Sequence, residues 1–230
     1  SDFEEQSAQP DFDTSELTFS YQQLFRDDRF SGSDRIGDAD QLTIGLTSRL
    51  IDKDTGVERL RGSIGQIFYF QDREVTLPGE IATTDNRSSF VGELAAEFGA
   101  GWRARAGLQW DPYADGGGNT EQGLVQINYR DPDRRTFNAA YRLRDGVTEQ
   151  TDLAIYWPIN DAFSVIGRHN YSLQEDRLLE ALVGVEYGRC CWRIRGLLRQ
   201  FANSSGDDTN LGFFVQLELR GLGRLGNDID

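Results

Sequence analysis

Hydrophobic and polar residues alternate along most of the chain with the two-residue period of a β-strand. In residues 41–51, for example, Leu42, Ile44 and Leu46 fall on one face, and the polar or small residues between them fall on the other. No segment shows the period of an amphipathic helix, so the chain is predicted to be all-β. The pattern predicts twelve strands, over residues 17–25, 41–51, 60–70, 90–98, 102–110, 123–130, 136–144, 151–157, 163–173, 178–187, 192–201 and 211–219.

The connections between these predicted strands alternate in length. They are short after residues 51, 98, 130, 157 and 187, and long after residues 25, 70, 110, 144, 173 and 201. Alternating short and long connections are typical of outer-membrane barrels, whose short turns face the periplasm. A soluble β-sandwich also alternates along its strands but gives no reason for this alternation of loops. Aromatic residues near the strand ends resemble an interfacial belt: Trp102, Trp110, Tyr129, Trp157, Tyr171, Tyr187 and Trp192.

The fold predicted from these features is an antiparallel outer-membrane β-barrel of about twelve strands. It forms a single region, with a leading loop over residues 1–16, strands between residues 17 and 222, and a tail over residues 223–230. The predicted strands have about the length that a tilted strand needs to cross a bilayer. No run of eighteen apolar residues is present, so a transmembrane helix is not expected.

Charge and composition narrow the possible functions. The net charge of -14 argues against nucleic-acid binding, which requires basic patches. Of the 24 basic residues all but Lys53 are arginine. Arginine forms forked hydrogen bonds to carboxylates, which makes a charged, hydrogen-bonded barrel interior plausible. The sequence has neither an initiator methionine nor a signal peptide, so we expect it to begin inside a longer protein.

The two cysteines of the chain, Cys190 and Cys191, are adjacent. Neighbouring cysteines can hardly bond each other, because disulfide geometry resists so short a link. If they are oxidised, each must reach a separate partner, and the chain holds no other thiol. Residue chemistry alone leaves two alternatives open: free thiols at a strand start, or anchors for a segment outside this chain in an oxidising compartment.

Three other groups of residues have side chains of the kinds found in catalytic, metal-binding or phosphate-binding sites. His169 is the single histidine and has no serine placed beside it, so we expect no hydrolase activity. The loop over residues 26–40 is rich in aspartates, but its spacing is not that of an EF-hand. Interleaved arginines favour an ion-pair network that orders the loop rather than a metal site. That network is predicted to include Arg26, Asp27, Asp28, Arg29, Asp34, Arg35 and Asp38. The glycines at 116–118 follow no phosphate-binding pattern, and no enzyme activity or cofactor is expected.

Several motifs resemble one known family over nearly the whole chain. Residues 24–42, with the sequence LFRDDRFSGSDRIGDADQL, resemble a signature of LptD, the outer-membrane lipopolysaccharide-assembly family also called organic solvent tolerance protein. Residues 59–70 resemble its next strand, residues 187–192 its paired-cysteine turn, and residues 213–223 its terminal strand. The resemblance covers only the C-terminal part of that family's barrel.

The resemblance implies a function, partners and site residues. Family members take lipopolysaccharide from a periplasmic jellyroll domain of the same protein, fed by a periplasmic bridge, and release it into the outer leaflet of a Gram-negative outer membrane. An LptE-like lipoprotein plugs the lumen, and the barrel assembly machinery inserts the barrel. Cys190 and Cys191 match cysteines that bond the N-terminal segment. The matching side of a lateral gate would be Phe213, Phe214, Val215, Gln216, Leu217, Glu218, Leu219 and Arg220. The alternative is a porin-like or structural barrel without lipopolysaccharide transport.

Overall fold

The computed structural model is an antiparallel all-β protein with one short 3-10 helix in the part that it describes. The residues described are 6, 20–26, 28–31, 35–38, 40–77, 82–114, 118–202, 209–219 and 223–225. The strands are β1 (Gln41–Ile51), β2 (Glu58–Tyr69), β3 (Phe90–Phe98), β4 (Trp102–Asp111), β5 (Asn119–Arg130), β6 (Thr136–Arg144), β7 (Thr148–Pro158), β8 (Phe163–Ser172), β9 (Arg177–Arg189), β10 (Trp192–Ala202), β11 (Thr209–Leu219) and β12 (Gly223–Leu225), and η1 is Gln23–Phe25.

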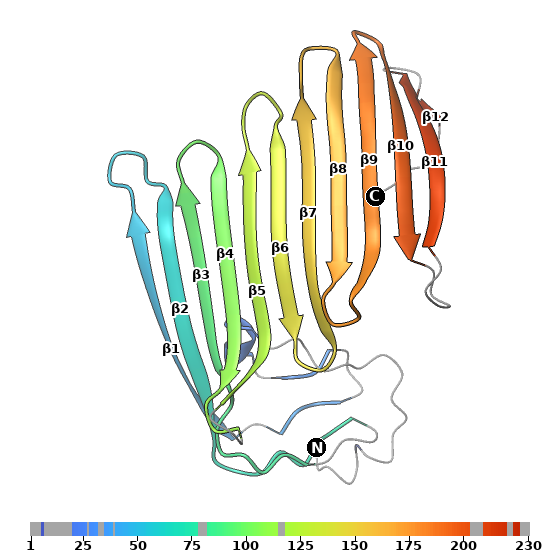
Figure 1. Ribbon diagram of the computed structural model, residues 1–230. Coiled ribbons are helices and arrows are strands. Elements are labelled where there is room, and N and C mark those ends of the chain that lie inside the picture. Colours follow the sequence, from blue (N-terminus) through green and yellow to red (C-terminus); the bar gives the residue numbers. More distant parts are fainter. Residues whose placement is uncertain are drawn as a thin grey trace. The chain divides into compact units, whose positions relative to one another are not determined.

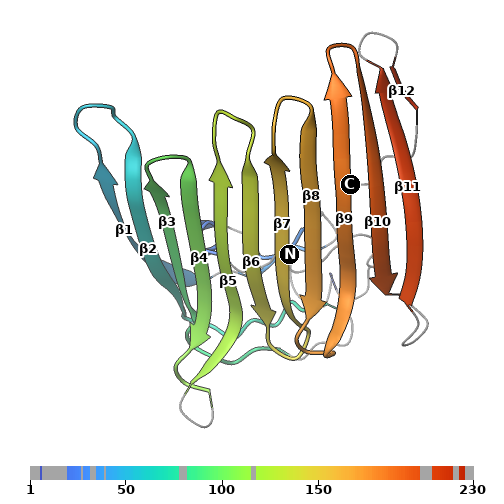
Figure 2. The same cartoon turned by 45° about the horizontal axis from the view of Figure 1, so that its top comes forward.

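The strands follow one another in the sheet in the order of the sequence, from β1 to β12. The contacts divide the chain into two compact units, Ser1–Ala95 with Gly107–Gln122, and Ala96–Ala106 with Gly123–Asp230. In the second unit, β6 to β11 run side by side in both ribbon views (Figure 1, Figure 2). Each of these strands is joined to the next by a hairpin, so successive connections fall at opposite ends of the strands.

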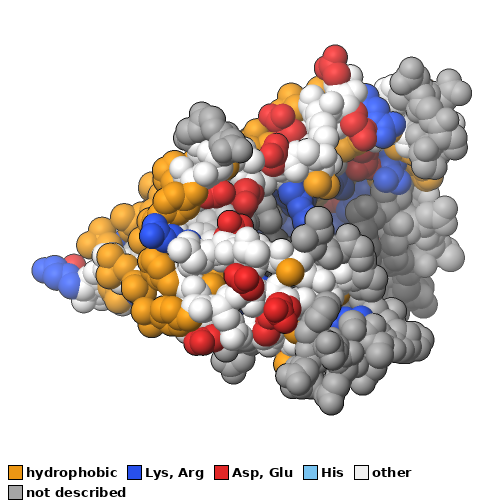
Figure 3. Space-filling view, turned by 90° about the horizontal axis from the view of Figure 1, so that it is seen from below, with side chains coloured by type: hydrophobic (Ala, Val, Ile, Leu, Met, Phe, Trp, Pro, Cys, Tyr) orange, Lys and Arg blue, Asp and Glu red, His pale blue; other side chains and the backbone are white. Residues whose placement is uncertain are grey.

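The strands of the second unit have one apolar and one polar face, as the alternation predicts. Val183 and Val185 of β9 are 62% and 60% exposed, whereas Glu186 beside them is 3% exposed. A soluble protein buries the apolar face of a sheet, so an exposed apolar face indicates a surface that another apolar phase covers. Hydrophobic and charged side chains gather on separate parts of the surface in Figure 3. The exposed apolar side chains on β7, β8, β9, β10 and β11 include Leu153, Ile155, Trp157, Phe163, Trp192, Ile194, Leu198, Leu211, Phe213 and Val215.

In the first unit, the segment 20–26 packs onto β1 and β2. Leu24 is fully buried and forms a small core with Ile67 and Val91, against which Tyr21 packs. The Thr43 hydroxyl donates a hydrogen bond to the Leu24 carbonyl at 2.9 Å. We call residues 20–26 the latch segment.

The predicted first strand, residues 17–25, is wrong over its described part. Residues 21 and 22 form a turn, and Gln23–Phe25 is η1. The alternation placed Tyr21 and Leu24 on opposite faces, but in the structure both contribute to the same core. Residues three apart lie on one side of a 3-10 helix, so burial of this pair favours the helix over the strand. Residues 1–5 and 7–16 of the predicted leading loop lie outside the described residues.

The other eleven predicted strands are confirmed, with small changes at their ends. The strict alternation of connection lengths is wrong, because β6–β7 and β8–β9 are joined by residues 145–147 and 173–176 alone. The strands continue into polar residues that were assigned to loops, such as Thr148, Glu149 and Arg177. A short strand, β12, occupies residues 223–225, where a tail was predicted. Among the described residues, no helix has the length and apolar character needed to span a membrane.

Candidate functional site at the cysteine turn

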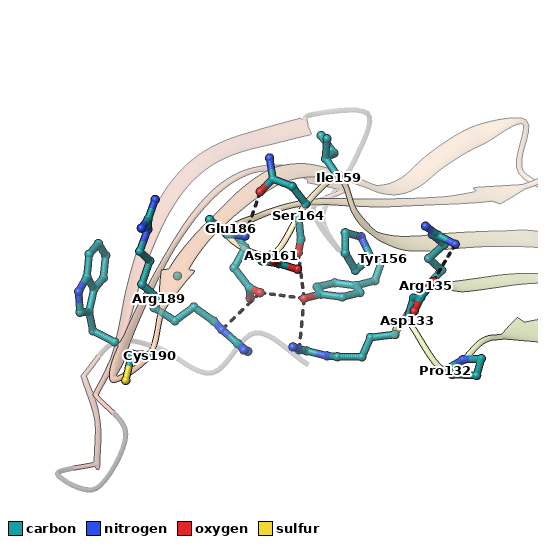
Figure 4. A pocket seen from close by; sticks show the side chains of 17 residues that line it. Pro132, Asp133, Arg135, Tyr156, Ile159, Asp161, Ser164, Glu186, Arg189 and Cys190 are labelled. Atoms are coloured by element: carbon teal, nitrogen blue, oxygen red, sulfur yellow. Dashed lines mark hydrogen bonds and ion pairs between the residues drawn. The ribbon is translucent and has the colours of Figure 1, made fainter.

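Three short turns of the second unit come together around a pocket of about 520 Å³ (Figure 4). They are residues 131–135 between β5 and β6, residues 159–162 between β7 and β8, and residues 190–191 between β9 and β10. In a meander, every second connection lies at the same end, which explains why these three turns are neighbours. The pocket is lined by Pro132, Asp133, Arg134, Arg135, Tyr156, Pro158, Ile159, Asn160, Asp161, Ala162, Ser164, Glu186, Gly188, Arg189, Cys190, Trp192 and Arg193.

Side chains fix the backbone of two of these turns. Asp131 Oδ1 accepts a hydrogen bond from the Arg135 amide at 2.8 Å. Asn160 Oδ1 accepts hydrogen bonds from the amides of Ala162 and Phe163, both at 2.9 Å. Short Asp and Asn side chains satisfy turn amides in this way, and the turns therefore hold the pocket wall in one shape.

The Tyr156 hydroxyl lies at the centre of the polar network under the pocket. It donates to Glu186 Oε1 at 2.8 Å and accepts from Ser164 Oγ at 3.1 Å and Arg134 Nη2 at 3.3 Å. Figure 4 shows Tyr156, Ser164 and Glu186 pointing toward one another. A phenol has one donor hydrogen and two lone pairs, so this hydroxyl uses its full hydrogen-bonding capacity.

Glu186 is a nearly buried carboxylate that contacts two arginines. Arg195 Nη2 lies 2.7 Å from Glu186 Oε2, and Arg193 Nε lies 3.4 Å from Glu186 Oε1. The same arginines reach the next strand, where Arg195 Nη1 lies 3.2 Å from Gln216 Oε1 and Arg193 Nη1 lies 3.9 Å from Glu218 Oε2. A buried carboxylate is tolerated only when it is paired, so this network makes the charge compatible with its site.

A second charged row crosses the polar face further from the cysteine turn. Arg168 Nη2 lies 2.9 Å from Asp152 Oδ2, and Arg168 Nη1 lies 3.3 Å from Glu180 Oε2. Arg199 also pairs with Glu180. The row joins β7, β8, β9 and β10, and it confirms that the arginines of the strands form a charged, hydrogen-bonded face.

Cys190 and Cys191 form the two-residue turn between β9 and β10, and both are exposed. Their sulfurs lie 2.9 Å apart, in contact but beyond the roughly 2.05 Å of a disulfide bond. Cys190 also lines the pocket. An exposed turn leaves both side chains accessible to another segment, and their bonding to cysteines outside this chain stays a prediction.

The predicted gate residues lie on β11 except Arg220, which is outside the described residues. Phe213 and Val215 lie on the exposed apolar face, at 69% and 53% exposure. β11 pairs with β10 from Thr209 to Leu219, whereas β12 pairs only with Leu217, Glu218 and Leu219. Most of β11 therefore has its pairing partner on one side within the described residues.

The predicted loop network belongs to the first unit and is not part of the pocket. Arg29 Nη1 lies 3.2 Å from Asp38 Oδ1, and Arg29 also donates to the Val75 carbonyl. Asp38 Oδ2 accepts from the amide of Glu74 at 2.6 Å, which ties this loop to the loop after β2. Asp28 accepts from the Phe30 and Gly37 amides, Arg35 is buried, and Arg26 donates its amide to the Gln23 carbonyl. Asp27 and Asp34 lie outside the described residues.

His169 lies on the exposed apolar face of β8 beside Tyr171, with ring centroids 6.2 Å apart. It pairs across the sheet with Leu153 and Ala181 and does not line the pocket. In the part of the chain that the structure describes, no group of three or more His, Cys, Asp or Glu side chains is placed to hold a metal ion.

The alternation and the motifs of the sequence did not predict that Tyr156, Glu186, Arg193 and Arg134 form one site. One signal for part of the site was available: Glu186 and Arg195 are equidistant from the Cys190–Cys191 turn, and a two-residue hairpin places such residues directly opposite each other. The contribution of Tyr156 and Arg134 could not be read in this way, because it depends on strands that are distant in sequence.

Comparison with known proteins gives consistent matches. The family model described as "LPS transport system D", LptD, matches residues 3–163. The chain is 43% identical over 228 residues to the LPS-assembly protein LptD of Nitrosococcus oceani, covering 99% of this chain and 30% of that protein. It is 40% identical over 223 residues to the protein of the same name from Hahella chejuensis, covering 95% and 28%, and 38% identical over 226 residues to that of Thiobacillus denitrificans, covering 98% and 30%. The chain thus spans about 30% of the length of the curated relatives it matches.

Proposed function

The chain belongs to the LptD family, LPS transport system D, and from that premise we propose that it forms the C-terminal part of an outer-membrane β-barrel that delivers lipopolysaccharide to the outer leaflet of a Gram-negative bacterium. The strands of the single region predicted for residues 1–230, which begin with β1, are the wall of this barrel. The observation that carries the proposal, beside the family match, is the pair of faces on β7 to β11.

An exposed apolar face suits contact with lipid chains, and a face crossed by arginine–carboxylate rows suits a polar lumen. A porin-like barrel would have the same two faces. The adjacent cysteines at the β9–β10 turn favour the lipopolysaccharide role, because a self-contained porin has no use for anchors to another segment.

We assign the lateral gate to β11, with Phe213 to Arg220 on one side and the first strand of the full-length barrel on the other. The pairing of β11 supports this: within the part of the chain that the structure describes, eleven residue pairs join it to β10, but three join it to β12. Each backbone hydrogen bond contributes on the order of 1 kcal/mol, so a seam short of a few bonds opens more readily than its neighbours.

The partners that we propose are assigned to the two faces and to the ends of the strands. An LptE-like lipoprotein would occupy the lumen against the polar face, and the jellyroll domain of the same protein would meet the end that carries the Cys190–Cys191 turn. The N-terminal segment would be joined there through Cys190 and Cys191, because this is the end at which the two thiols are exposed. The periplasmic bridge would deliver the lipid, and the barrel assembly machinery would insert the barrel.

A seam-locking experiment in the full-length protein tests the transport role. A cysteine at Phe213, a β11 residue that β12 does not cover, and a second at the facing position of the first strand, once oxidised, should stop newly made lipopolysaccharide from reaching a membrane-impermeant surface label, and reduction should restore it. The matched control is Val183→Cys with Leu198→Cys, which are directly opposed on β9 and β10 and should lock a pair that never opens. Unchanged delivery through a fully locked seam would contradict the gate.

A further inference from the structure

Arg134 is an exposed arginine at the edge of the cysteine-turn pocket. No carboxylate within the described residues pairs with it. Among the described residues, its guanidinium makes one hydrogen bond, to the Tyr156 hydroxyl, and lies 5.7 Å from the centre of the Tyr156 ring. A guanidinium has five N–H donors, so most of its donors remain available to a ligand in the pocket.

The backbone conformation of Arg134 also differs from that of an ordinary surface arginine. Its φ is +67°, in the left-handed region that residues other than glycine seldom adopt. Its amide donates to the Asp131 carbonyl at 3.2 Å, inside the turn that Asp131 organises. The turn therefore presents the Arg134 side chain toward Tyr156 in a fixed direction.

The network beneath the pocket carries an excess of positive charge. Glu186 is shared by Arg193 and Arg195, and Arg193 reaches the second carboxylate, that of Glu218, only at 3.9 Å. The lining of the pocket as a whole has four arginines, Arg134, Arg135, Arg189 and Arg193, and three carboxylates, Asp133, Asp161 and Glu186. An anion bound between Arg134 and Arg193 would complete the charge balance, and arginine is the residue best suited to bind phosphate in a forked geometry.

The rest of the lining indicates what the anion is attached to. Asp133 and Asp161 line the pocket, and their carboxylates can accept hydrogen bonds from hydroxyl groups, although Asp133 Oδ2 also lies 3.2 Å from Arg135 Nη1. A volume of about 520 Å³ lies in the range of small-molecule sites and exceeds the need of a lone anion. A ligand that offers both a phosphate and several hydroxyls matches a lining of both arginines and carboxylates, whereas an acyl chain does not.

We propose that this pocket binds a phosphorylated sugar, with Arg134 and Arg193 contacting the phosphate and Asp133 and Asp161 contacting hydroxyl groups. The sugar phosphate can be a soluble molecule or the headgroup of a lipid. If the ligand is a lipid headgroup, the proposal rests on the proposed function and extends it. If the ligand is a soluble sugar phosphate, the proposal is independent of that function.

Calorimetric titration of the full-length protein, purified with its lipoprotein partner in detergent, tests the site with glucose 1-phosphate as the probe. We expect saturable binding that Arg134→Gln weakens by about tenfold or more, the cost of one charge-assisted hydrogen bond. Arg144→Gln, an exposed arginine of β6 that does not line the pocket, should bind as the wild type does. Equal affinity of Arg134→Gln and wild type, or no saturable binding to wild type, would overturn the proposal.

Further titrations separate the possible ligands. Glucose and inorganic phosphate should each bind more weakly than glucose 1-phosphate, and equal binding of inorganic phosphate would overturn the sugar assignment. Displacement of the probe by diphosphoryl lipid A micelles, but not by dephosphorylated lipid A, would support the lipid headgroup as the source. Displacement by neither would support a soluble sugar phosphate. A protein that binds the probe but fails the seam-locking test would refute the transport role and leave this site intact.

Discussion

Gly65→Ala should release the latch segment from β1 and β2. Gly65 and Gly45 are directly paired across these strands, and the latch segment rests on both. A Cβ at position 65 would lie 2.6 Å from Leu24 Cδ1 and 2.9 Å from the Ile44 carbonyl oxygen. The leucine can move, but the carbonyl belongs to the paired strand. For the methyl group to fit, Leu24 must leave its position and the Ile44 carbonyl must shift slightly within the paired strand.

The free energy of this release follows from the contacts that are lost. Leu24 is fully buried, and exposing a leucine costs about 1.5–3 kcal/mol. The hydrogen bond from Thr43 to the Leu24 carbonyl, and that from the Tyr21 amide to Glu93 at 3.1 Å, contribute about 1 kcal/mol each. Replacing a strand glycine by alanine offsets roughly 0.5–1 kcal/mol of this loss. The net cost is about 2.5–4.5 kcal/mol, which raises the detached fraction by roughly sixtyfold to two thousandfold.

Hydrogen exchange of the peptide covering residues 20–26, in the full-length protein, measures this fraction. Gly65→Ala should speed exchange there while the peptides of β1 and β2 stay protected. Gly62→Ala is the matched control on the same strand, because a Cβ at position 62 meets only Leu94 Cδ1, at 3.7 Å. Leu24→Ala should reproduce the release without any clash. Wild-type protection in both Gly65→Ala and Leu24→Ala would refute the reasoning.

Three further predictions concern the cysteines, the charged row and the loop. Non-reducing electrophoresis of the full-length protein should show Cys190 and Cys191 each bonded outside this chain, and free thiols at both positions would contradict this. Arg168→Ala should lower the free energy of unfolding by roughly 1–2 kcal/mol, because Asp152 and Glu180 each lose an ion-pair partner. The loss is detected as a lower temperature at which the folded protein changes to its unfolded mobility on gels. Arg168→Lys should lower that temperature less. Equilibrium dialysis should detect no stoichiometric Ca²⁺ binding that depends on Asp38, because that carboxylate is already used by Arg29 and the Glu74 amide.

Strand positions could be predicted because one face of each strand is apolar over its whole length. The same signal failed at residues 17–25, where Leu24 and Tyr21 had to meet in one core, and no period in so short a segment distinguishes a strand from a turn. The alternation also predicted shorter strands than the structure has at several positions. The alternation fades where Thr148, Glu149 and Gln150 continue β7, since polar residues on both faces give no contrast although the backbone still pairs.

The candidate site was predictable only where a hairpin brings its residues together. Glu186 and Arg195 face each other because the Cys190–Cys191 turn fixes their register. The contacts of Tyr156 with Glu186 and with Arg134 join residues that are 30 and 22 positions apart. They depend on the register of three separate hairpins, which a single sequence does not specify at the level of individual side chains.

The charged rows also bear on where this wall can open. Between β9 and β10, Arg195 meets Glu186 at 2.7 Å and Arg199 pairs with Glu180. Between β10 and β11, Arg195 donates to a neutral acceptor on Gln216 at 3.2 Å, and Arg193 forms an ion pair with Glu218 at 3.9 Å. Among the described residues, the ion pairs between β9 and β10 are therefore shorter than the one between β10 and β11, and β12 pairs with three residues of β11. The proposed gate beyond β11 agrees with this order, and the pocket network around Tyr156 lies on the side that the proposal keeps closed.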